Sequence, residues 1–408
     1  MVRATVEDLT DREVHGRRVF VRVDLNVPLG EDGRIADAGR IVAVLPTLEH
    51  LRRRGARLVL ASHLGRPDGA PDPAYSLRPV AEDLERRLEQ SVTFIEGGVE
   101  GERTREAVSA LEDGGVALLE NVRFAPGETK NDPTFARALA DLGDHYVSDA
   151  FGAAHRAHAS TVGAAEVVKQ RGGRAVAGLL MARELHFLDE ALRSPEPPFV
   201  AVMGGAKISG KIEVVDAILG QVDRLLVGGA MANTFFRALG LEVGRSLVEE
   251  DRVDFARDLL ERAGEKIVLP VDCVVGYEIV RDTETRTRRR DEIGPNDRVG
   301  DVGPETLRMF TEEVHAAGTV VWNGPMGVFE VPPFDRGTRE VALALAHATD
   351  AGTVSIVGGG DSAAAAEAAG VADRITHIST GGGASLELLA GKRLPGVEVL
   401  EPKAEGER

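Results

Sequence analysis

Short, continuous apolar runs recur along the chain, and they limit its possible folds more than any other feature. The runs are rich in β-branched residues, and many end in Gly, Asn, Asp or His, which stop a strand and begin a loop. Helical patterns separate them. Strands that are apolar throughout are typical of parallel sheets buried on both faces by helices. The runs are VFVRVDL, RLVLASH, VTFIEG, VALLENV, HYVSDAF, FVAVMGG, RLLVGG, KIVLPVD, TVVWNG, TVSIVGG and ITHIST.

The chain divides near residues 180–197. Its 408 residues exceed what one ordinary hydrophobic core holds. The stretch AVAGLLMARELHFLDEALRSPEPPF, residues 175–199, is interpreted as one helix that ends before Ser194. The prolines that follow it cannot continue a helix. We therefore predict two α/β halves, each built on a mainly parallel sheet and joined by a hinge helix.

Composition excludes several classes of partner. The net charge is −17, which disfavours nucleic acid and anionic membranes. No apolar stretch approaches the roughly 20 residues that span a bilayer, and the first residues lack the pattern of a signal peptide. The single cysteine, Cys273, lies in the apolar stretch VDCVV and is interpreted as a packing residue. We expect a cytoplasmic protein that binds neither nucleic acid nor membrane.

Cations gather where the predicted strands of the first half end. Arginine forks match phosphate and carboxylate oxygens, whereas a single arginine is typically a solvated surface charge. Five strand ends that carry Arg or His favour a pocket for a small polyanion. The histidines show no second cluster at zinc-ligand spacing, and a Ser-His-Asp triad lacks the G-x-S-x-G elbow. The residues are Arg22 with Asp24 and Asn26, then Arg40, His63, Arg66, Arg123, His155, Arg156 and His158.

Glycine-rich loops follow strands in the second half. The loop VMGGAKISGK brings Lys207 and Lys211, two of only seven lysines, to a helix start where backbone N–H groups favour anions. Four further loops are GGAMANTF, VVWNGPMGVFE, SIVGGGDSA and ISTGGGASLELL. A glycine run can also be only a tight turn, but five at one sheet edge, one with Asp361 available for magnesium, indicate a nucleotide phosphate site.

A polyanion site in one half and a nucleotide site in the other suggest phosphoryl transfer, with domain closure that excludes water. Two alternatives stay open. A P-loop-type NTPase would use GAKISGKI, although Ile212 stands where a magnesium-binding hydroxyl is required. We instead interpret Ile212 as the start of a buried helical stripe with Val215 and Leu219. The other alternative is a non-catalytic phosphometabolite-binding protein on the same fold.

Several motifs, in order over residues 21–396, resemble the phosphoglycerate kinase family. They are VRVDLNVP, SHLGRP, LLENVRF, DAFGAAHRAHAS, GGAKISGK, VWNGPMGVFE, GGGDS and STGGGASLELLAGKRLPG. The resemblance implies two Rossmann-like domains joined by a hinge helix. Residues 1–180 would bind 3-phosphoglycerate, residues 181–197 form the hinge helix and linker, and residues 198–380 bind nucleotide. Residues 381–408 would return to the N-terminal domain as a C-terminal tail.

The resemblance also implies an activity. It is reversible phosphoryl transfer between 1,3-bisphosphoglycerate and Mg-ADP, giving 3-phosphoglycerate and Mg-ATP in glycolysis and gluconeogenesis. The enzyme would be a phosphotransferase with a carboxyl group as acceptor. Its partners would be these small molecules, with Mg²⁺ as cofactor, and we expect a monomer. In-line transfer through a highly charged transition state needs positioning and electrostatic stabilisation rather than a covalent intermediate.

Residue roles are carried over from the same resemblance. Arg40, Lys207, Gly382 and Gly383 would surround the moving phosphoryl group, and Asp361 would lie nearest magnesium. Glu330 would meet the ribose hydroxyls. Gly210 and Ser362 depart from the residues usual in the family, an acid and Thr respectively, which leaves nucleotide affinity open. Substrate would be bound by Asp24, Asn26, Arg40, His63, Arg66, Arg123 and Arg156, and nucleotide by Lys211, Glu330, Gly359, Gly360, Asp361 and Ser362.

Overall fold

The computed structural model describes residues 2–30 and 32–403, and it separates into two compact units. The first unit comprises Met1–His186 together with Arg393–Arg408, and the second comprises Phe187–Lys392. The division falls inside helix α8 (Leu179–Arg193). Both units are α/β, as the alternation of apolar runs and helical patterns predicts. None of the described helices has the length and apolar character that crossing a membrane requires.

The first unit is built on a six-stranded parallel sheet in the order β3-β4-β2-β1-β5-β6. Strand β1 is central, and its residue Val21 pairs with Leu60 on one side and Val147 on the other. The chain turns from one side of β1 to the other between β4 and β5, so the topological switch point lies beside β1. The strands are β1 (Arg18–Val23), β2 (Arg57–Ala61), β3 (Val92–Ile95), β4 (Val116–Leu119), β5 (His145–Asp149) and β6 (Ala175–Ala177).

Helices cover this sheet through one apolar face each. Helix α2 buries Ile41, Val44, Leu48 and Leu51, a helical spacing, although Pro46 lies in its interior. Its buried side chains join the core formed with the β1 and β2 side chains. The helices of this unit are α1 (Asp11–Val14), α2 (Gly39–Arg53), α3 (Arg78–Leu88), α4 (Glu102–Ser109), α5 (Pro126–Thr129), α6 (Pro133–Ala140), α7 (Ala164–Gln170) and α16 (Pro395–Glu398), with the start of α8.

The second unit repeats the architecture with another six-stranded parallel sheet, in the order β15-β14-β13-β7-β8-β9. Its core holds Trp322, the largest fully buried side chain. The switch point lies between β7 and β13, which are neighbours in the sheet but distant in sequence. The strands are β7 (Phe199–Met203), β8 (Arg224–Val227), β9 (Ile267–Val268), β13 (Thr319–Asn323), β14 (Val354–Gly358) and β15 (His377–Ile378).

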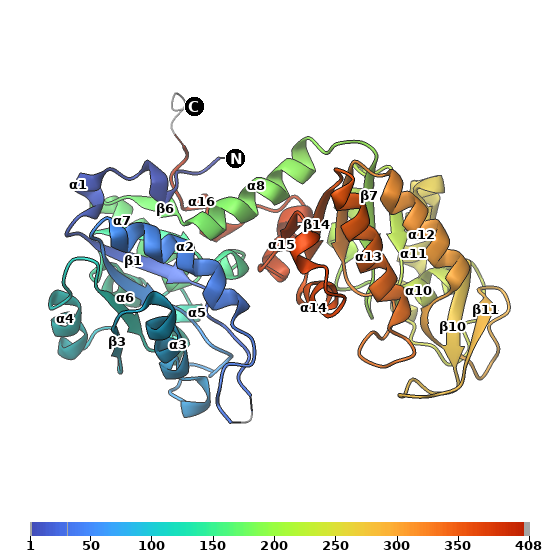
Figure 1. The fold of residues 1–408 in the computed structure, drawn as a ribbon, viewed down its shortest axis with the longest axis horizontal. Helices are drawn as coiled ribbons and strands as arrows, with labels where there is room; N and C mark the ends of the chain where they lie inside the picture. The colour runs from blue at the N-terminus through green and yellow to red at the C-terminus, as the bar shows by residue number, and fades with distance from the viewer. Residues whose placement is uncertain (1, 31, 404–408) are drawn as a thin grey trace. The chain divides into compact units, whose positions relative to one another are not determined.

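Helices also cover the second sheet, and α12 and α13 pack side by side against it (Figure 1). Helix α9 buries Val214, Val215, Ile218 and Leu219. The predicted stripe is therefore correct for Val215 and Leu219, whereas Ile212, in the first turn, is only half-buried. The helices are α9 (Ile212–Leu219), α10 (Met231–Ala238), α11 (Val253–Ala263), α12 (Pro304–Ala316), α13 (Arg336–Asp350), α14 (Gly360–Ala368) and α15 (Gly383–Leu389).

Two features differ from the sequence prediction. Residues 175–177 are not the start of a helix: they form β6, which pairs with β5, and α8 begins only at Leu179. Pairing with a sheet edge overrides the local helical pattern there. The second unit also contains a small antiparallel sheet that the apolar runs did not reveal. Its order is β11-β10-β12, with β10 (Asp272–Gly276), β11 (Thr285–Arg289) and β12 (Arg298–Val302).

The two ends of the described chain lie beside each other in the first unit (Figure 1). Arg3 pairs with Pro402 in an antiparallel bridge, and the Arg3 guanidinium forms a 2.5 Å ion pair with Glu398. Arg174 binds both Glu13 and Glu401, at 3.1 and 2.7 Å. These contacts join residues near the C-terminus to the first sheet.

Helix α2 offers a matched test of the first core. Leu48 is 0% exposed, whereas Val42, on the same helix, is 46% exposed. We expect Leu48→Ala to lower the free energy of unfolding by about 2–5 kcal/mol, because it removes buried methyl groups and leaves a cavity. Val42→Ala should change it by less than about 0.5 kcal/mol. Urea unfolding followed by circular dichroism measures both, and equal shifts would contradict the packing of α2.

Candidate active site

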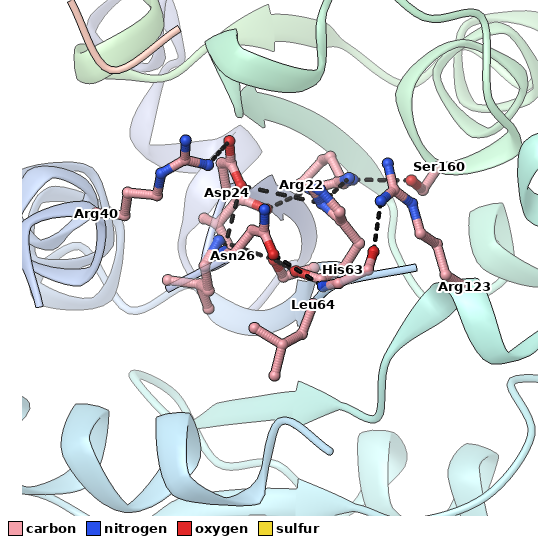
Figure 2. A network of polar contacts seen from close by, with 12 residues as sticks. Arg22, Asp24, Asn26, Arg40, His63, Leu64, Arg123 and Ser160 are labelled. Carbon is pink, nitrogen blue, oxygen red and sulfur yellow. Dashed lines mark hydrogen bonds and ion pairs between the residues drawn. The ribbon is translucent and has the colours of Figure 1, made fainter. Parts of the chain in front are cut away.

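Polar side chains of the first unit meet where β1 and β2 end (Figure 2). Asp24 and Asn26 directly follow β1, His63 follows β2, and Arg40 lies in the first turn of α2. Arg40 Nη1 donates to Asp24 Oδ2 at 2.7 Å, and Asn26 Oδ1 accepts the Gly65 N–H at 2.8 Å. The loops after β1 and β2 are therefore held in one arrangement, and four of the predicted substrate residues lie together.

Arg123 extends this network from the end of β4. It lies in the 3₁₀ turn η3 (Val122–Phe124), where the Asn121 side chain accepts its backbone N–H. Its Nη1 donates to the backbone carbonyl of Gly65 at 2.7 Å. Gly65 is also the residue whose N–H donates to the Asn26 side chain. One short loop thus connects Arg123 with the ends of β1 and β2.

The electrostatics of this cluster are dominated by positive charge. Burial, and then the charges of Arg22 and Arg156, lower the pKa of Arg123 to about 10. Burial and the nearby arginines likewise lower the pKa of His158 to about 4. Burial alone would raise the pKa of Asp24, but His63, Arg40 and Arg22 hold it below its ordinary value. Cations that depress one another's pKa form a site that an anion would stabilise.

A pocket of about 560 Å³ opens beside the network. Arg66, Arg123 and Arg156 line it together with Lys130 and His158. The structure thus brings three of the four predicted substrate-binding arginines to one cavity. The predicted partners Asp24, Asn26, Arg40 and His63 do not line this pocket, and they adjoin it through the Arg123–Gly65 contact. Lys130 is a further cation of the pocket that sequence patterns did not indicate.

The side chain of Lys211 has a defined position in the second unit. Its Nζ donates to Gly204 O at 2.5 Å and Asn323 O at 2.8 Å, which are the carbonyls at the ends of β7 and β13. Gly324 makes room for it: its φ is +94°, and a Cβ there would lie 2.2 Å from Lys211 Nζ. Burial lowers the pKa of Lys211 to about 8, while the charge of Asp361 acts in the opposite direction. Lys207, in contrast, is exposed.

The loop that carries both lysines binds a carboxylate from its own chain. Glu249 Oε2 accepts the N–H groups of Ile208 and Ser209 at 2.5 and 3.1 Å, and Oε1 accepts the Ser209 hydroxyl. Burial raises the pKa of Glu249, but these hydrogen bonds and the charge of Lys207 bring it below its ordinary value. Two of the backbone amides that a P-loop would offer to phosphate, those of Ile208 and Ser209, are therefore bonded to Glu249 in this structure.

A cavity of about 360 Å³ lies among the glycine loops of the second unit. Gly205, Gly229 and Gly327 line it, and Glu330 and Asp361 contribute carboxylates. The buried thiol of Cys273 also faces it, and burial raises the pKa of this thiol to about 12, so Cys273 is a packing residue as predicted. The volume is within the range of small-molecule sites.

Helix starts contribute the remaining predicted residues. Gly359 caps α14 with φ +92°, and Gly360, Asp361 and Ser362 form its first turn. The Ser362 hydroxyl is buried and accepts the Gly324 N–H at 2.6 Å, so it holds the β13 loop. Gly382 caps α15, and Gly383 is its first residue. Of the residues predicted for the nucleotide and the transfer step in this unit, only Glu330 and Asp361 line the cavity. Those that do not line it are Lys207, Lys211, Gly359, Gly360, Ser362, Gly382 and Gly383.

Comparison with known proteins decides the family. A profile described as phosphoglycerate kinase matches residues 9–392. The chain belongs to the phosphoglycerate kinase family. The phosphoglycerate kinase of Picosynechococcus is 50% identical over 402 residues, which cover 98% of this chain and 100% of the relative. That of Chlorobium phaeobacteroides is 52% identical over 397 residues, covering 97% and 99%.

Solved structures agree with the family assignment. Phosphoglycerate kinase from Coxiella burnetii superposes with a TM-score of 0.86 at 41% identity, covering 97% of this chain and 98% of that one. The Pyrococcus horikoshii enzyme gives 0.83 at 34% identity and covers 98% of each chain. The fold predicted from the resemblance to phosphoglycerate kinases is confirmed. The P-loop interpretation of residues 205–212 loses its basis, since the family differs and Glu249 binds the loop amides.

Sequence patterns did not indicate several residues that support the candidate sites of this phosphoglycerate kinase family member. Glu128 is buried and accepts the Ser160 N–H and hydroxyl at 2.9 and 2.6 Å. Asn323 holds the β14 loop by donating to Gly358 O at 2.8 Å. Glu249 binds the lysine loop although it lies 38 residues after Lys211 in the sequence. Glu128 and Glu249 lie outside all the quoted motifs, and the motif VVWNGPMGVFE contains Asn323 without indicating its contact with Gly358.

The Glu249 contact predicts a change in backbone protection. Glu249→Ala removes the acceptor of two amides, and we expect hydrogen exchange at Ile208 and Ser209 to accelerate by about tenfold or more, the equivalent of one lost hydrogen bond. Glu250→Ala is the matched control, because this neighbouring carboxylate contacts Arg237 and not the loop. Exchange measured by NMR in both variants tests the contact, and unchanged protection in Glu249→Ala would contradict it.

Proposed function

We propose that the protein transfers a phosphoryl group reversibly between 1,3-bisphosphoglycerate and Mg-ADP, giving 3-phosphoglycerate and Mg-ATP. The observation that carries the proposal is the cationic cluster of the first unit, where Arg66, Arg123 and Arg156 line one pocket. A polyanionic ligand would stabilise such a cluster, which stands out in a chain of net charge −17. Membership in the phosphoglycerate kinase family supplies the reaction.

The first unit would bind the sugar acid. Arg66, Arg123 and Arg156 would bind its phosphate, because their guanidinium groups line the cationic pocket. Asp24, Asn26 and His63 would bind the remaining polar groups of the sugar acid, since they adjoin that pocket. Arg40 would contact the transferring phosphoryl group from the start of α2.

The second unit would bind the nucleotide in the glycine-lined cavity. Glu330 suits ribose hydroxyls, because a carboxylate would repel phosphates. Lys211, Gly359, Gly360 and Ser362 would form the phosphate end of the site. Asp361 fits magnesium as an exposed carboxylate in the first turn of α14, since Mg²⁺ commonly takes one or two carboxylates beside nucleotide phosphates. Bound Mg²⁺ would neutralise phosphate charge.

Transfer needs no covalent intermediate in this proposal. The reacting oxygens must align, and the charge on the moving phosphoryl group must be stabilised. Arg40, Lys207 and the amides of Gly382 and Gly383 would supply that stabilisation. A carboxylate leaving group needs little help from a proton donor, which agrees with the absence of a general base from the proposed roles.

A coupled assay tests the function directly. The purified protein is given 3-phosphoglycerate and Mg-ATP, and the product is followed through NADH oxidation by a coupling dehydrogenase. Turnover that requires both substrates is expected. Binding of both ligands in calorimetry without turnover would instead favour a non-catalytic phosphometabolite-binding protein.

Arg40 provides a test of the transfer step. We expect Arg40→Ala to lower kcat by about a thousandfold, by analogy with arginines that stabilise phosphoryl transfer, and to leave the Kd of Mg-ADP within about twofold. Arg34→Ala is the matched control, because its side chain is 88% exposed and pairs only with Asp32 among the described residues. Steady-state kinetics and calorimetry measure both variants. A loss below tenfold in Arg40→Ala would contradict a role in transfer.

The buried position of Lys211 predicts a pH dependence of nucleotide binding. Burial lowers its pKa to about 8, so Lys211 is charged below this pH and neutral above it. A phosphate stabilises the charged form, and affinity for Mg-ADP should therefore fall as pH rises through 8, by up to about tenfold per pH unit. Phosphate itself is fully ionised there, since its second pKa is about 6. Calorimetry should show a flat and weaker profile for Lys211→Met, and an equally steep one would contradict the assignment.

A further inference from the structure

Arg22, at the end of β1, is completely buried within the first unit, and all three nitrogens of its guanidinium group make polar contacts (Figure 2). Its Nε donates to Ser160 Oγ at 2.8 Å, and its Nη1 donates to the backbone carbonyl of Val23. Its Nη2 lies 3.1 Å from His63 Nδ1. Arg22 does not line the cationic pocket that holds Arg66, Arg123 and Arg156, so its buried contact with His63 indicates a role other than direct ligand binding.

The chemistry of the two groups determines the proton on His63. A guanidinium has donors and no acceptor, so Nη2–H must donate, and Nδ1 must present a lone pair. A neutral imidazole that accepts at Nδ1 carries its hydrogen on Nε2. Burial, opposed by Asp24 and reinforced by Arg22, holds the pKa of His63 well below its ordinary value, so the ring is neutral at neutral pH. Nε2 makes no hydrogen bond with another residue of the described chain, so its hydrogen is available to a ligand.

The Asp24 carboxylate is a competing partner for Nδ1 of His63. Asp24 Oδ1 lies 3.9 Å from the same Nδ1. A carboxylate at that position would favour the opposite tautomer, with hydrogen on Nδ1 pointing to Asp24. Arg22 and Asp24 therefore act on one ring nitrogen in opposite directions, and the closer contact belongs to Arg22.

Ser160 and Glu128 fix the position of the Arg22 guanidinium. Ser160 lies in the π-helical turn η5 (Ala159–Gly163), and its hydroxyl donates to the buried carboxylate of Glu128 at 2.6 Å while accepting from Arg22. Tyr146, on β5, donates to Ser160 O at 2.9 Å. Glu128 thus orients the one hydroxyl that orients the guanidinium, and its negative charge partly compensates the buried cation.

We propose that Arg22 is a positioning residue that fixes His63 as its Nε2–H tautomer and thereby directs this hydrogen to an oxygen of the sugar-acid substrate. Arg22 acts through His63 without contacting the substrate. The substrate part of the proposal rests on the proposed function, in which His63 binds the sugar acid. The tautomer part depends only on the ligand-free protein.

Nitrogen-15 NMR of the ligand-free protein tests the tautomer, with His63→Gln identifying the signals of this ring. In the native protein, Nδ1 should give the shift of an unprotonated nitrogen and Nε2 that of a protonated one. Arg22→Met should move the hydrogen to Nδ1, because Asp24 is then the nearest partner, and Arg22→Lys should retain it on Nε2. A native ring protonated on Nδ1, or no change in Arg22→Met, would overturn the proposal.

Ser160→Ala keeps the test decisive if Arg22→Met does not fold. It removes only the acceptor of Arg22 Nε, and a measurable Nδ1–H population is expected, whereas its absence would overturn the role of the Glu128–Ser160 support. In the coupled assay, Ser160→Ala and Arg22→Met should raise KM for 3-phosphoglycerate by about tenfold, the effect of one hydrogen bond to a charged group, with KM for ATP within about twofold. Arg22→Lys should recover most of this loss.

An equal rise in both KM values would indicate a merely structural role and overturn the substrate part. Native protein that shows the predicted tautomer but no turnover would refute the proposed function and leave the assignment of the tautomer intact.

Discussion

Complete burial of two parallel sheets is the constraint on which the rest of the structure depends. Strands such as β1 and β7 have helices on both faces, so their side chains must be apolar along most of their length. Polar chemistry is then restricted to the carboxyl ends of the strands, where the chain leaves the core. In both units most candidate site residues lie in these loops or at the helix starts that follow them, and Asp24, Asn26 and Lys211 follow strands that flank the topological switch points.

Charge is the second constraint, and it follows from the first. A site for a polyanion at the edge of a buried sheet needs cations that are themselves partly buried. In the first unit, burial and the charge of Arg22 lower the pKa of Arg123. The buried carboxylates Asp24 and Glu128 partly offset this repulsion, so the acids of the site act as support for its arginines. In the free protein the compensation remains incomplete, and an anionic ligand would complete it.

Much of this could be predicted from the sequence, because apolar runs and glycine loops are local signals. All eleven quoted runs contain strands, and the two-unit α/β fold followed from them. Candidate site residues near strand ends, such as Asp24 and His63, could be proposed for the same reason. The antiparallel sheet was missed because β11 is a charged edge strand whose identity comes from pairing with β10. Glu249 was missed because its contact with Ile208 depends on tertiary folding and on no local pattern.

The loop at residues 205–212 illustrates how tertiary contacts decide between two interpretations of one motif. Its resemblance to a P-loop depends on Gly210, yet a Cβ at Gly210 would meet nothing within 4 Å, so packing in this structure does not require glycine there. Gly324 is different, because a side chain there would displace Lys211 from the carbonyls that hold it. The glycine that determines the position of Lys211 therefore belongs to the β13 loop. A phosphate site built in this way depends on two neighbouring parallel strands, whereas a P-loop depends on one strand and the helix that follows it.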